Sequence, residues 1–329
     1  MSQNSDSQPS VTTPISPVAI TTLFDMEIPF RSSYQLKAYR FVSSSPEQSH
    51  PKIVLVSGLH GNEVTPIYAV NQLQKIIQRY SLQQGSVDII PVVNTLGLDQ
   101  TMKRFPLDYK DINKIFPGDP EGSVSYRIAH VVQDFCAPHD WVICLHSGGA
   151  HVRDIPQVRM VREQEDVSRC FSLPFIWKRQ GIGGTASLLD ICNTRKQNVL
   201  YFSAGRGETL DLSLASHVVK ALVEFLVHLH MLPTECLQEF SSVSSYGNSI
   251  CVEDEHISEC RSQHSGFFIS EKNIGDIVQS GDILGYIENV IGGERVETIL
   301  APWNALVVGI RCNPIVYPQE LLLKLAQIP

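Results

Sequence analysis

The sequence lacks several patterns that would assign the protein to common classes. None of its eight cysteines, at positions 136, 144, 170, 192, 236, 251, 260 and 312, forms a C-x-x-C pair, which argues against a zinc ribbon or a thioredoxin-type site. No stretch is apolar for long enough to span a membrane. Dense Lys/Arg runs are also missing, and the net charge is −8. We therefore expect neither a nucleic-acid partner nor a membrane partner.

The remaining composition predicts a globular cytoplasmic protein. The chain has 329 residues, of which 43% are hydrophobic and 18% charged, enough for a large core and a second, smaller domain. Scattered cysteines act as small hydrophobes in a reducing cytoplasm. Residues 1–18 are rich in Ser, Gln, Thr and Pro and lack the apolar segment of a signal peptide. We expect them to form a disordered tail.

Two apolar runs are each followed by a histidine. Residues 53–56 form a continuous β-branched and aliphatic run, typical of a buried parallel strand, and His60 and Glu63 follow it. Residues 141–145 form a second such run, and His146 follows it directly. Because open α/β sheets bind ligands at the carboxyl ends of their strands, we expect these side chains to meet there.

The three side chains form a recognisable ligand set. His60, Glu63 and His146 are the two histidines and one glutamate that catalytic zinc uses when it keeps one position open for water. One H-x-x-E motif alone is a weak signal, and the second strand-end histidine strengthens it. We predict one Zn²⁺ per chain, although the ligand types leave manganese and cobalt open.

Helical and extended patterns alternate along the first two thirds of the chain. Helices are expected at 65–80, 126–135, 185–194 and 212–230, and strands within 28–42 and at 53–56, 87–93, 141–145, 175–178 and 199–203. The long segment 95–119 between them is predicted to be a functional loop. This alternation predicts an α/β fold with a mixed, largely parallel sheet flanked by helices.

The last part of the chain changes character. The Ser-rich segment 234–249 is a plausible boundary, and strand-and-turn sequence follows it. Residues 277–285 are loosely echoed by 315–323, as in the two halves of a biotinyl/lipoyl-like β-sandwich. A carrier domain needs a lysine at its hairpin tip, and the comparable stretch 301–306 has none. We therefore expect a first domain over 19–233 and a structural or substrate-gating β domain over 250–329.

Three segments carry a resemblance to a known family. They are GLHGNE at 58–63, KDINKIFPGD at 110–119 and LHSGG at 145–149. In order and spacing they resemble the succinylglutamate desuccinylase/aspartoacylase family, a branch of the zinc carboxypeptidase-like hydrolases. The resemblance implies a zinc-dependent hydrolase that cleaves an amide bond in a small substrate bearing a carboxylate, such as an N-acyl amino acid. It also implies a C-terminal β domain.

The resemblance extends to substrate-binding residues. Arg104 corresponds to an arginine that stabilises the oxyanion and binds substrate, and Asn113 to an asparagine that helps to hold the substrate carboxylate. Lys114 stands where the family pattern has arginine. The positive charge is kept, but lysine lacks the guanidinium fork that binds a carboxylate through two hydrogen bonds.

Two positions depart further from the pattern. Ser203 occupies the place of the family's catalytic glutamate in a gapless alignment, and Cys144 stands where the family usually has aspartate. Glu208, five positions after Ser203, is the predicted general base, although a glutamate before a helix is also favoured by the helix dipole. Two alternatives stay open: a relative that binds metal and ligand without turnover, and a carboxypeptidase acting on small peptides. A homo-oligomer also stays open.

Overall fold

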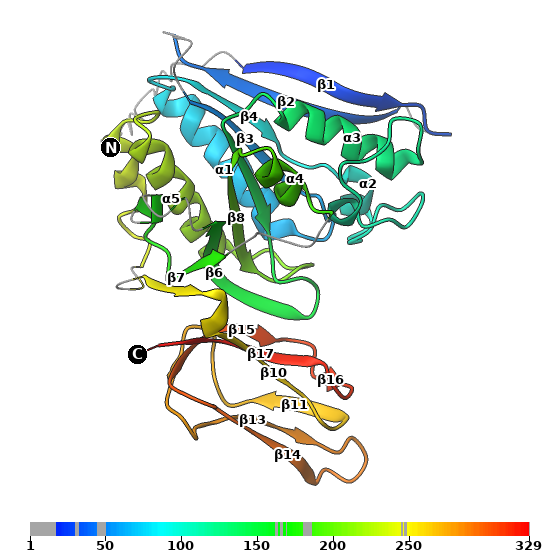
Figure 1. Cartoon of the computed structure of the whole chain (residues 1–329), viewed down its shortest axis with the longest axis vertical. Helices are drawn as coiled ribbons and strands as arrows, with labels where there is room; N and C mark the ends of the chain where they lie inside the picture. Colours follow the sequence, from blue (N-terminus) through cyan, green and yellow to red (C-terminus); the bar gives the residue numbers. More distant parts are fainter. Residues whose placement is uncertain are drawn as a thin grey trace, which may run out of the picture.

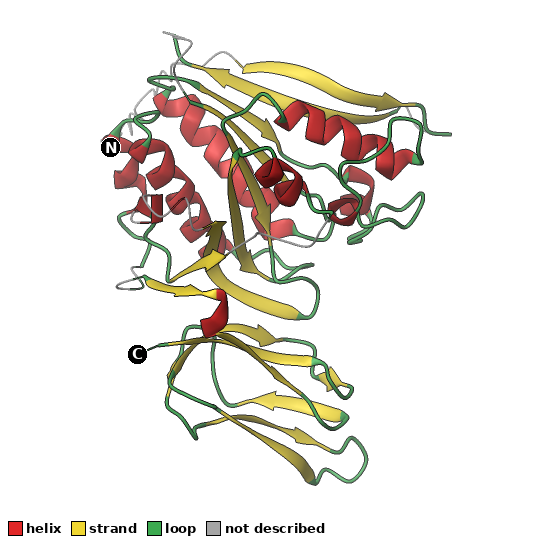
Figure 2. Ribbon diagram, viewed as in Figure 1, coloured by secondary structure: helices red, strands yellow, loops and turns green. Residues whose placement is uncertain are grey.

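The protein consists of an α/β part and an all-β part (Figure 1). The structure is a computed structural model, and it describes residues 18–29, 33–44, 51–161, 164, 167–168, 170–179, 186–244, 246 and 249–328. The tail expected over residues 1–18 lies outside these ranges except for Val18, which opens the first strand. The α-helices all lie in the α/β part among the residues described (Figure 2).

The α/β part alternates strands and helices. Its strands are β1 Val18–Met26, β2 Tyr34–Val42, β3 Lys52–Ser57, β4 Ser86–Ile90, β5 Trp141–His146, β6 Val152–Val161, β7 Phe175–Arg179 and β8 Asn198–Gly205. Its helices are α1 Val64–Tyr80, α2 Thr95–Asp99, α3 Val124–Cys136, α4 Leu188–Thr194 and α5 Leu212–His228, with 3-10 turns η1 Ile112–Lys114 and η3 Thr234–Phe240. Most expected elements are confirmed to within a few residues.

The centre of the sheet is parallel. Strands β4, β3, β5 and β8 run side by side in that order and in parallel register, while β1 and β2 form an antiparallel edge. Every residue of 53–57 is buried, as the continuous apolar run predicts. The mixed, largely parallel sheet expected from the sequence is therefore confirmed.

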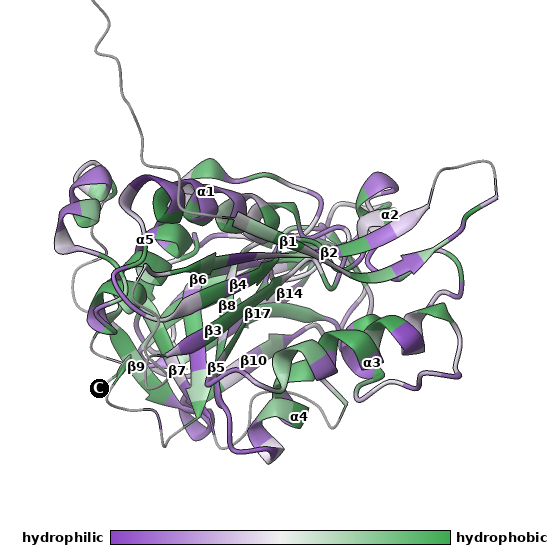
Figure 3. Ribbon diagram, turned by 90° about the horizontal axis from the view of Figure 1, so that it is seen from above, coloured by the Kyte–Doolittle hydropathy of each residue, from purple (hydrophilic) through white to green (hydrophobic). Residues whose placement is uncertain are grey.

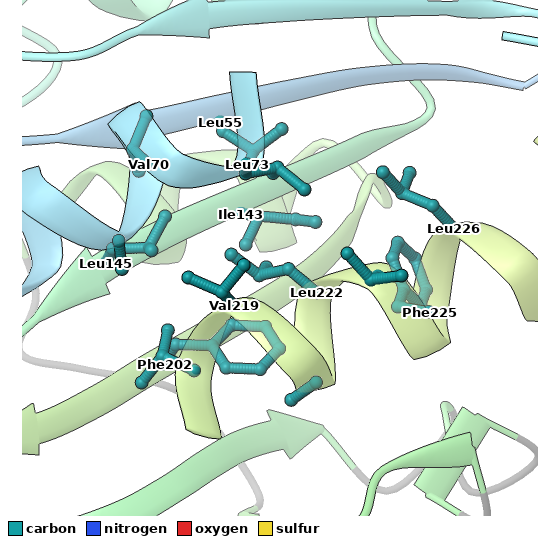
Figure 4. Close-up of a cluster of buried hydrophobic side chains, with 14 of the residues drawn as sticks. Leu55, Val70, Leu73, Ile143, Leu145, Phe202, Val219, Leu222, Phe225 and Leu226 are labelled. Carbon is teal, nitrogen blue, oxygen red and sulfur yellow. The ribbon is translucent and has the colours of Figure 1, made fainter. Parts of the chain in front are cut away.

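Helices cover both faces of this sheet. Viewed from above, α1 and α5 lie on one side of the strands and α3 and α4 on the other (Figure 3). Apolar residues of α1 and α5, among them Leu73 and Leu222, pack against Leu145 and Phe202 of the strands (Figure 4). On the opposite face, Val132 of α3 belongs to the second core cluster. Burial on both faces fixes the strand ends that carry the predicted site.

The all-β part is a two-sheet sandwich. Its strands are β9 Ile250–Glu253, β10 Ile257–Arg261, β11 Gly266–Ser270, β12 Ile277–Val278, β13 Ile283–Glu288, β14 Arg295–Leu300, β15 Ala305–Arg311, β16 Ile315–Val316 and β17 Leu321–Gln327, with the 3-10 turn η4 Asp254–His256. The sheet β14-β13-β11-β16 packs on strands β10, β12, β15 and β17 around a separate apolar core. The predicted repeat is real, because in each half a two-residue strand precedes a longer one.

The two parts share one continuous sheet. Strand β6 pairs with β15, and β9, which opens the second part, pairs with β7 of the first. Strand β6 was not predicted from the sequence, because polar residues such as Arg153, Asp154 and Gln157 interrupt its apolar pattern. The predicted domain limits remain a prediction, and the physical connection between the parts is this strand pairing.

Candidate metal centre

Tight packing shapes the loop that carries His60 and Glu63. Gly58 has a φ of +63°, and a Cβ there would lie 2.9 Å from the Val92 backbone. At Gly61, a Cβ would overlap the backbone of Gly97 in α2. Only glycine fits at these two positions, so the loop that joins β3 to α1 packs closely against Val92 and Gly97. The main chain thereby holds His60 and Glu63 beyond the carboxyl end of the sheet.

The three predicted ligands converge. Nδ1 of His60 lies 3.0 Å from Glu63 Oε1, and Nδ1 of His146 lies 2.9 Å from Glu63 Oε2. One ligand atom from each residue lies within 4.8 Å of the others. All three side chains are buried. The convergence of two imidazole nitrogens on one carboxylate is the arrangement that the strand-end motifs predicted.

This donor set fits a divalent metal. A tetrahedral ion with bonds of about 2.1 Å holds neighbouring ligand atoms roughly 3.4 Å apart, close to the separations seen between the imidazoles and Glu63. Ser147, the residue after His146, is buried, and its side-chain oxygen has no hydrogen-bond partner among the described residues. Two histidines and one carboxylate are typical of a catalytic zinc site.

Asp111 supports the site from outside, a role that the sequence analysis did not assign to it. Its Oδ1 lies 3.0 Å from Nε2 of His60, and Lys103 Nζ lies 3.3 Å from its Oδ2. A carboxylate on the outer nitrogen of a metal-binding histidine fixes the ring orientation and the tautomer. The only signal in the sequence was its place in the KDIN segment, beside Asn113.

The buried charges shift one another's pKa values. Burial disfavours the charged form of His60, but the carboxylates of Glu63 and Asp111 outweigh burial and raise its pKa to about 9. Burial likewise opposes the ionisation of Glu63, yet the imidazoles of His60 and His146 lower its pKa to about 2. Burial raises the pKa of Asp111, but His60 and Lys103 lower it further than burial raises it. At neutral pH the cluster therefore keeps both carboxylates negative and a proton on His60, and a bound metal ion would take the place of that proton.

The predicted substrate-binding residues lie on the segment that carries Asp111. Arg104 is exposed, and its guanidinium donates to the carbonyl of Tyr109 at 3.2 Å. Asn113 is half-buried and accepts a hydrogen bond from the Leu188 N–H at 3.3 Å, at the start of α4. Lys114 ends η1 and is exposed. Their roles toward a substrate remain predictions.

The side chain of Glu208 lies near the loop that carries His60 and Glu63. It is exposed, and its Oε1 lies 3.5 Å from Nδ2 of Asn62, which stands between His60 and Glu63. The base role of Glu208 remains a prediction, and its proximity to the ligand loop is compatible with that role.

Ser203 and Cys144 are both buried in the sheet. Ser203 pairs in register with His146 on the neighbouring strand. Cys144 packs in the apolar cluster beneath α3 and α4, and burial raises the pKa of its thiol well above the usual value. A buried neutral thiol gives the metal ligands no charged support.

Comparison with solved structures defines the fold. The solved structure of the Ectoine utilization protein EutE (DoeB) from Ruegeria pomeroyi superimposes with a TM-score of 0.77 at 19% identity, covering 96% of this chain and 99% of that one. A succinylglutamatedesuccinylase/aspartoacylase structure from Rhodobacter sphaeroides gives a TM-score of 0.77 at 16% identity, with 98% of each chain covered. The protein thus has the fold of these two structures over nearly its whole length.

The sequence comparisons find similarity to one family. Residues 49–175 match the Succinylglutamate desuccinylase/Aspartoacylase catalytic domain. Over 250 residues the chain is 27% identical to the N-alpha-acetyl-L-2,4-diaminobutyric acid deacetylase of Halomonas elongata, which covers 72% of this chain and 70% of that protein. The match covers the segments around His60, Asp111 and His146 and agrees with the family resemblance that the three sequence segments predicted.

Proposed function

We propose that the protein is a zinc-dependent hydrolase that removes the acyl group from a small N-acyl amino acid. The observation that carries this proposal is the convergence of the His60 and His146 Nδ1 atoms on the two oxygens of Glu63. The relative from Halomonas elongata, named as a deacetylase of an N-acetylated amino acid, supports the same reaction class. A catalytic zinc lowers the pKa of water and polarises a carbonyl group.

The residues around the ligands have separate roles in this proposal. His60, Glu63 and His146 hold the ion, and Asp111 keeps the His60 ring in one orientation. Glu208, tied to Asn62, takes the proton that the attacking water gives up. Arg104 stabilises the oxyanion, and Asn113 and Lys114 bind the substrate carboxylate. The roles of Arg104, Asn113 and Lys114 rest on the family resemblance, and the role of Glu208 is supported by the contact of its side chain with Asn62.

The class of partner and the location follow from the same features. A small carboxylate is the substrate class that the family implies, and no described helix has the length and apolarity to cross a membrane. The cysteines at positions 136, 144, 170, 192, 236, 260 and 312 are free thiols, which supports a reducing cytoplasm as the setting.

Amine release from a panel of N-acetyl and N-succinyl amino acids tests the proposal. Zinc-loaded wild-type protein should release the free amino acid, and His146→Ala should abolish release together with the bound zinc. Simple dipeptides in the same panel test the carboxypeptidase alternative. If the zinc-loaded protein releases no amine from any of these compounds, the hydrolase proposal is wrong.

One alternative has its own support. Ser203 and Cys144 stand where the family pattern has acidic residues, and Glu208 is exposed. These features favour a relative that binds zinc and a carboxylate ligand without turnover. Binding of an N-acyl amino acid, measured by calorimetry, without any amine release over many hours would favour this alternative.

A further inference from the structure

A buried chain of polar contacts begins beside the metal ligands. The Ser203 hydroxyl donates to Asp154 Oδ2 at 2.8 Å, and both side chains are at most 1% exposed. Ser203 also pairs in register with the ligand His146 across parallel strands, so the two side chains leave the sheet on the same face. Asp154 is therefore one hydrogen bond away from a residue that neighbours the site.

The carboxylate of Asp154 is compensated from two parts of the molecule. Arg159 Nη2 lies 3.6 Å from its Oδ2, and Lys324 Nζ lies 3.5 Å from its Oδ1. Arg159 belongs to β6 and is held between the rings of Trp177 and Tyr201, each 4.7 Å away. Lys324 belongs to β17 of the all-β part. A buried carboxylate needs such partners, because an uncompensated charge is costly in the protein interior.

The β6–β15 pairing makes room for the lysine. Gly309 of β15 lies opposite Asp154, and a Cβ there would lie 3.3 Å from both Asp154 Oδ1 and Lys324 Cδ. A larger residue at this position would crowd the ion pair. The absence of a side chain at Gly309 thus leaves room for Lys324 to reach Asp154 in strand β6.

The contacts from Lys324 through Asp154 to Ser203 determine whether the Ser203 hydroxyl donates or accepts a hydrogen bond. A hydroxyl has one proton, and an ionised carboxylate can only accept hydrogen bonds. Because the proton of Ser203 is committed to Asp154, its oxygen can only accept from any further partner. We propose that Asp154 and Lys324 are positioning residues that make Ser203 a fixed hydrogen-bond acceptor beside His146. The acceptor would take an O–H or N–H of water or substrate, and in this respect the inference rests on the proposed hydrolysis.

In this proposal a residue of the all-β part, Lys324, helps to keep Ser203 a hydrogen-bond acceptor. A glutamate at position 203 would itself be an acceptor, whereas an isolated serine can donate or accept. Asp154 removes that ambiguity, and Lys324 stabilises the charge that does so. A purely structural ion pair between the two parts would instead affect stability and leave turnover unchanged.

The first test compares Ser203→Ala, Asp154→Asn and the double variant on the substrate that the wild-type protein turns over best. Asparagine keeps the shape of Asp154 but can donate to Ser203, which frees the hydroxyl proton. We expect kcat to fall roughly tenfold to a hundredfold in each single variant, with KM and zinc content nearly unchanged. The double variant should be no worse than Ser203→Ala. Wild-type kcat in Ser203→Ala, or losses that multiply in the double variant, would overturn the inference.

A second readout does not depend on turnover. Cobalt-substituted protein reports the surroundings of the metal through its visible absorption spectrum. We expect Ser203→Ala, Asp154→Asn and Lys324→Met to change this spectrum, and Lys324→Arg to keep it close to wild type. Lys272→Met is the matched control, because it breaks a 3.7 Å ion pair with Asp282 elsewhere in the all-β part.

The two readouts separate the two claims. Altered cobalt spectra in a protein that releases no amine would refute the proposed hydrolysis and keep the positioning chain. Identical spectra in all variants would refute the positioning chain even if the wild-type protein is an active deacylase. If Asp154→Asn does not fold, Ser203→Ala and the Lys324 pair carry the same test.

Discussion

The N–H of Glu208 donates to the carbonyl oxygen of Asn62 across 2.6 Å. This bond ties the loop after β8 to the turn between His60 and Glu63. Glu208 itself has a φ of 64°, a left-handed conformation that is uncommon for a residue with a side chain. Such strain is typical of functional sites, where the surrounding structure holds it in place. The relationship supports the choice of Glu208 over an unrelated surface glutamate as the base.

Replacing Glu208 by glutamine should lower kcat by about 10²–10⁴-fold, because the amide cannot accept the proton. Zinc content should stay at the wild-type level, since Glu208 is not among the three converging ligands. Steady-state kinetics on the best N-acyl amino acid measures the effect. Glu121→Gln is the matched control, an exposed glutamate on the loop before α3. Equal kcat values for both variants and wild type would remove Glu208 from the mechanism.

Alanine at His60 or at His146 should abolish tight zinc binding. Each substitution removes one of three donors, and the remaining pair cannot complete the site. Zinc per chain after dialysis, measured by atomic absorption, should fall from about one to near zero. His228→Ala, at the exposed end of α5, should keep its zinc. Unchanged metal content in either ligand variant would refute the proposed centre.

Asp111→Asn should weaken zinc binding about 10–100-fold without removing a ligand. The amide keeps the size of the side chain but loses the charge that faces Nε2 of His60. Competition with a chromophoric chelator gives the dissociation constant. Asp119→Asn, an exposed aspartate on the same loop, serves as the control. A zinc affinity equal to that of the control would mean that the Asp111 contact does not support the ligand.

The sequence predicted the convergence of His60, Glu63 and His146 because the signals are local. His60, Glu63 and His146 each follow an apolar run, and parallel strands bring their ends together by geometry. Asp111 was visible within its motif, but the imidazole it contacts lies 51 residues away. Such a contact depends on how the long loop folds back, which periodicity does not encode.

The contacts between the two parts were beyond sequence patterns for a different reason. Strand β6 carries charged residues that are buried, and their ion-pair and hydrogen-bond partners lie on strands far away in the sequence. Asp154 is paired with Lys324 from the other end of the chain and with Ser203 from β8. Hydrophobic patterning assigns such residues to the surface, so both the strand and its polar chain were missed. Buried charged residues that are paired with an opposite charge cannot be predicted from hydrophobic patterning.

A last prediction concerns stability at low pH, at a site remote from the metal. Asp88 of β4 is buried and accepts two hydrogen bonds from Arg40, at 2.8 and 2.9 Å, while His139 Nε2 lies 2.8 Å away. Burial raises the pKa of Asp88, but His139 and Arg40 outweigh it and hold the pKa below its usual value. The ionised carboxylate is therefore better stabilised in the folded protein than in the unfolded chain.

The direction of the pH effect follows from that shift. Above about pH 4 the carboxylate is ionised in both states, and its full stabilising contribution is present. As the pH falls from 4 toward the lower pKa of the folded state, the unfolded chain takes up the proton first and stability is lost.

Asp88→Asn should cost about 3 kcal/mol at pH 7, because it removes the charge that Arg40 and His139 face. The variant should also lose less further stability than wild type between pH 4 and 2. Urea unfolding at pH 7 measures the first effect, and urea unfolding between pH 4 and 2 measures the second, with the exposed Asp134→Asn as control. Parallel pH profiles for Asp88→Asn and wild type would contradict the assignment.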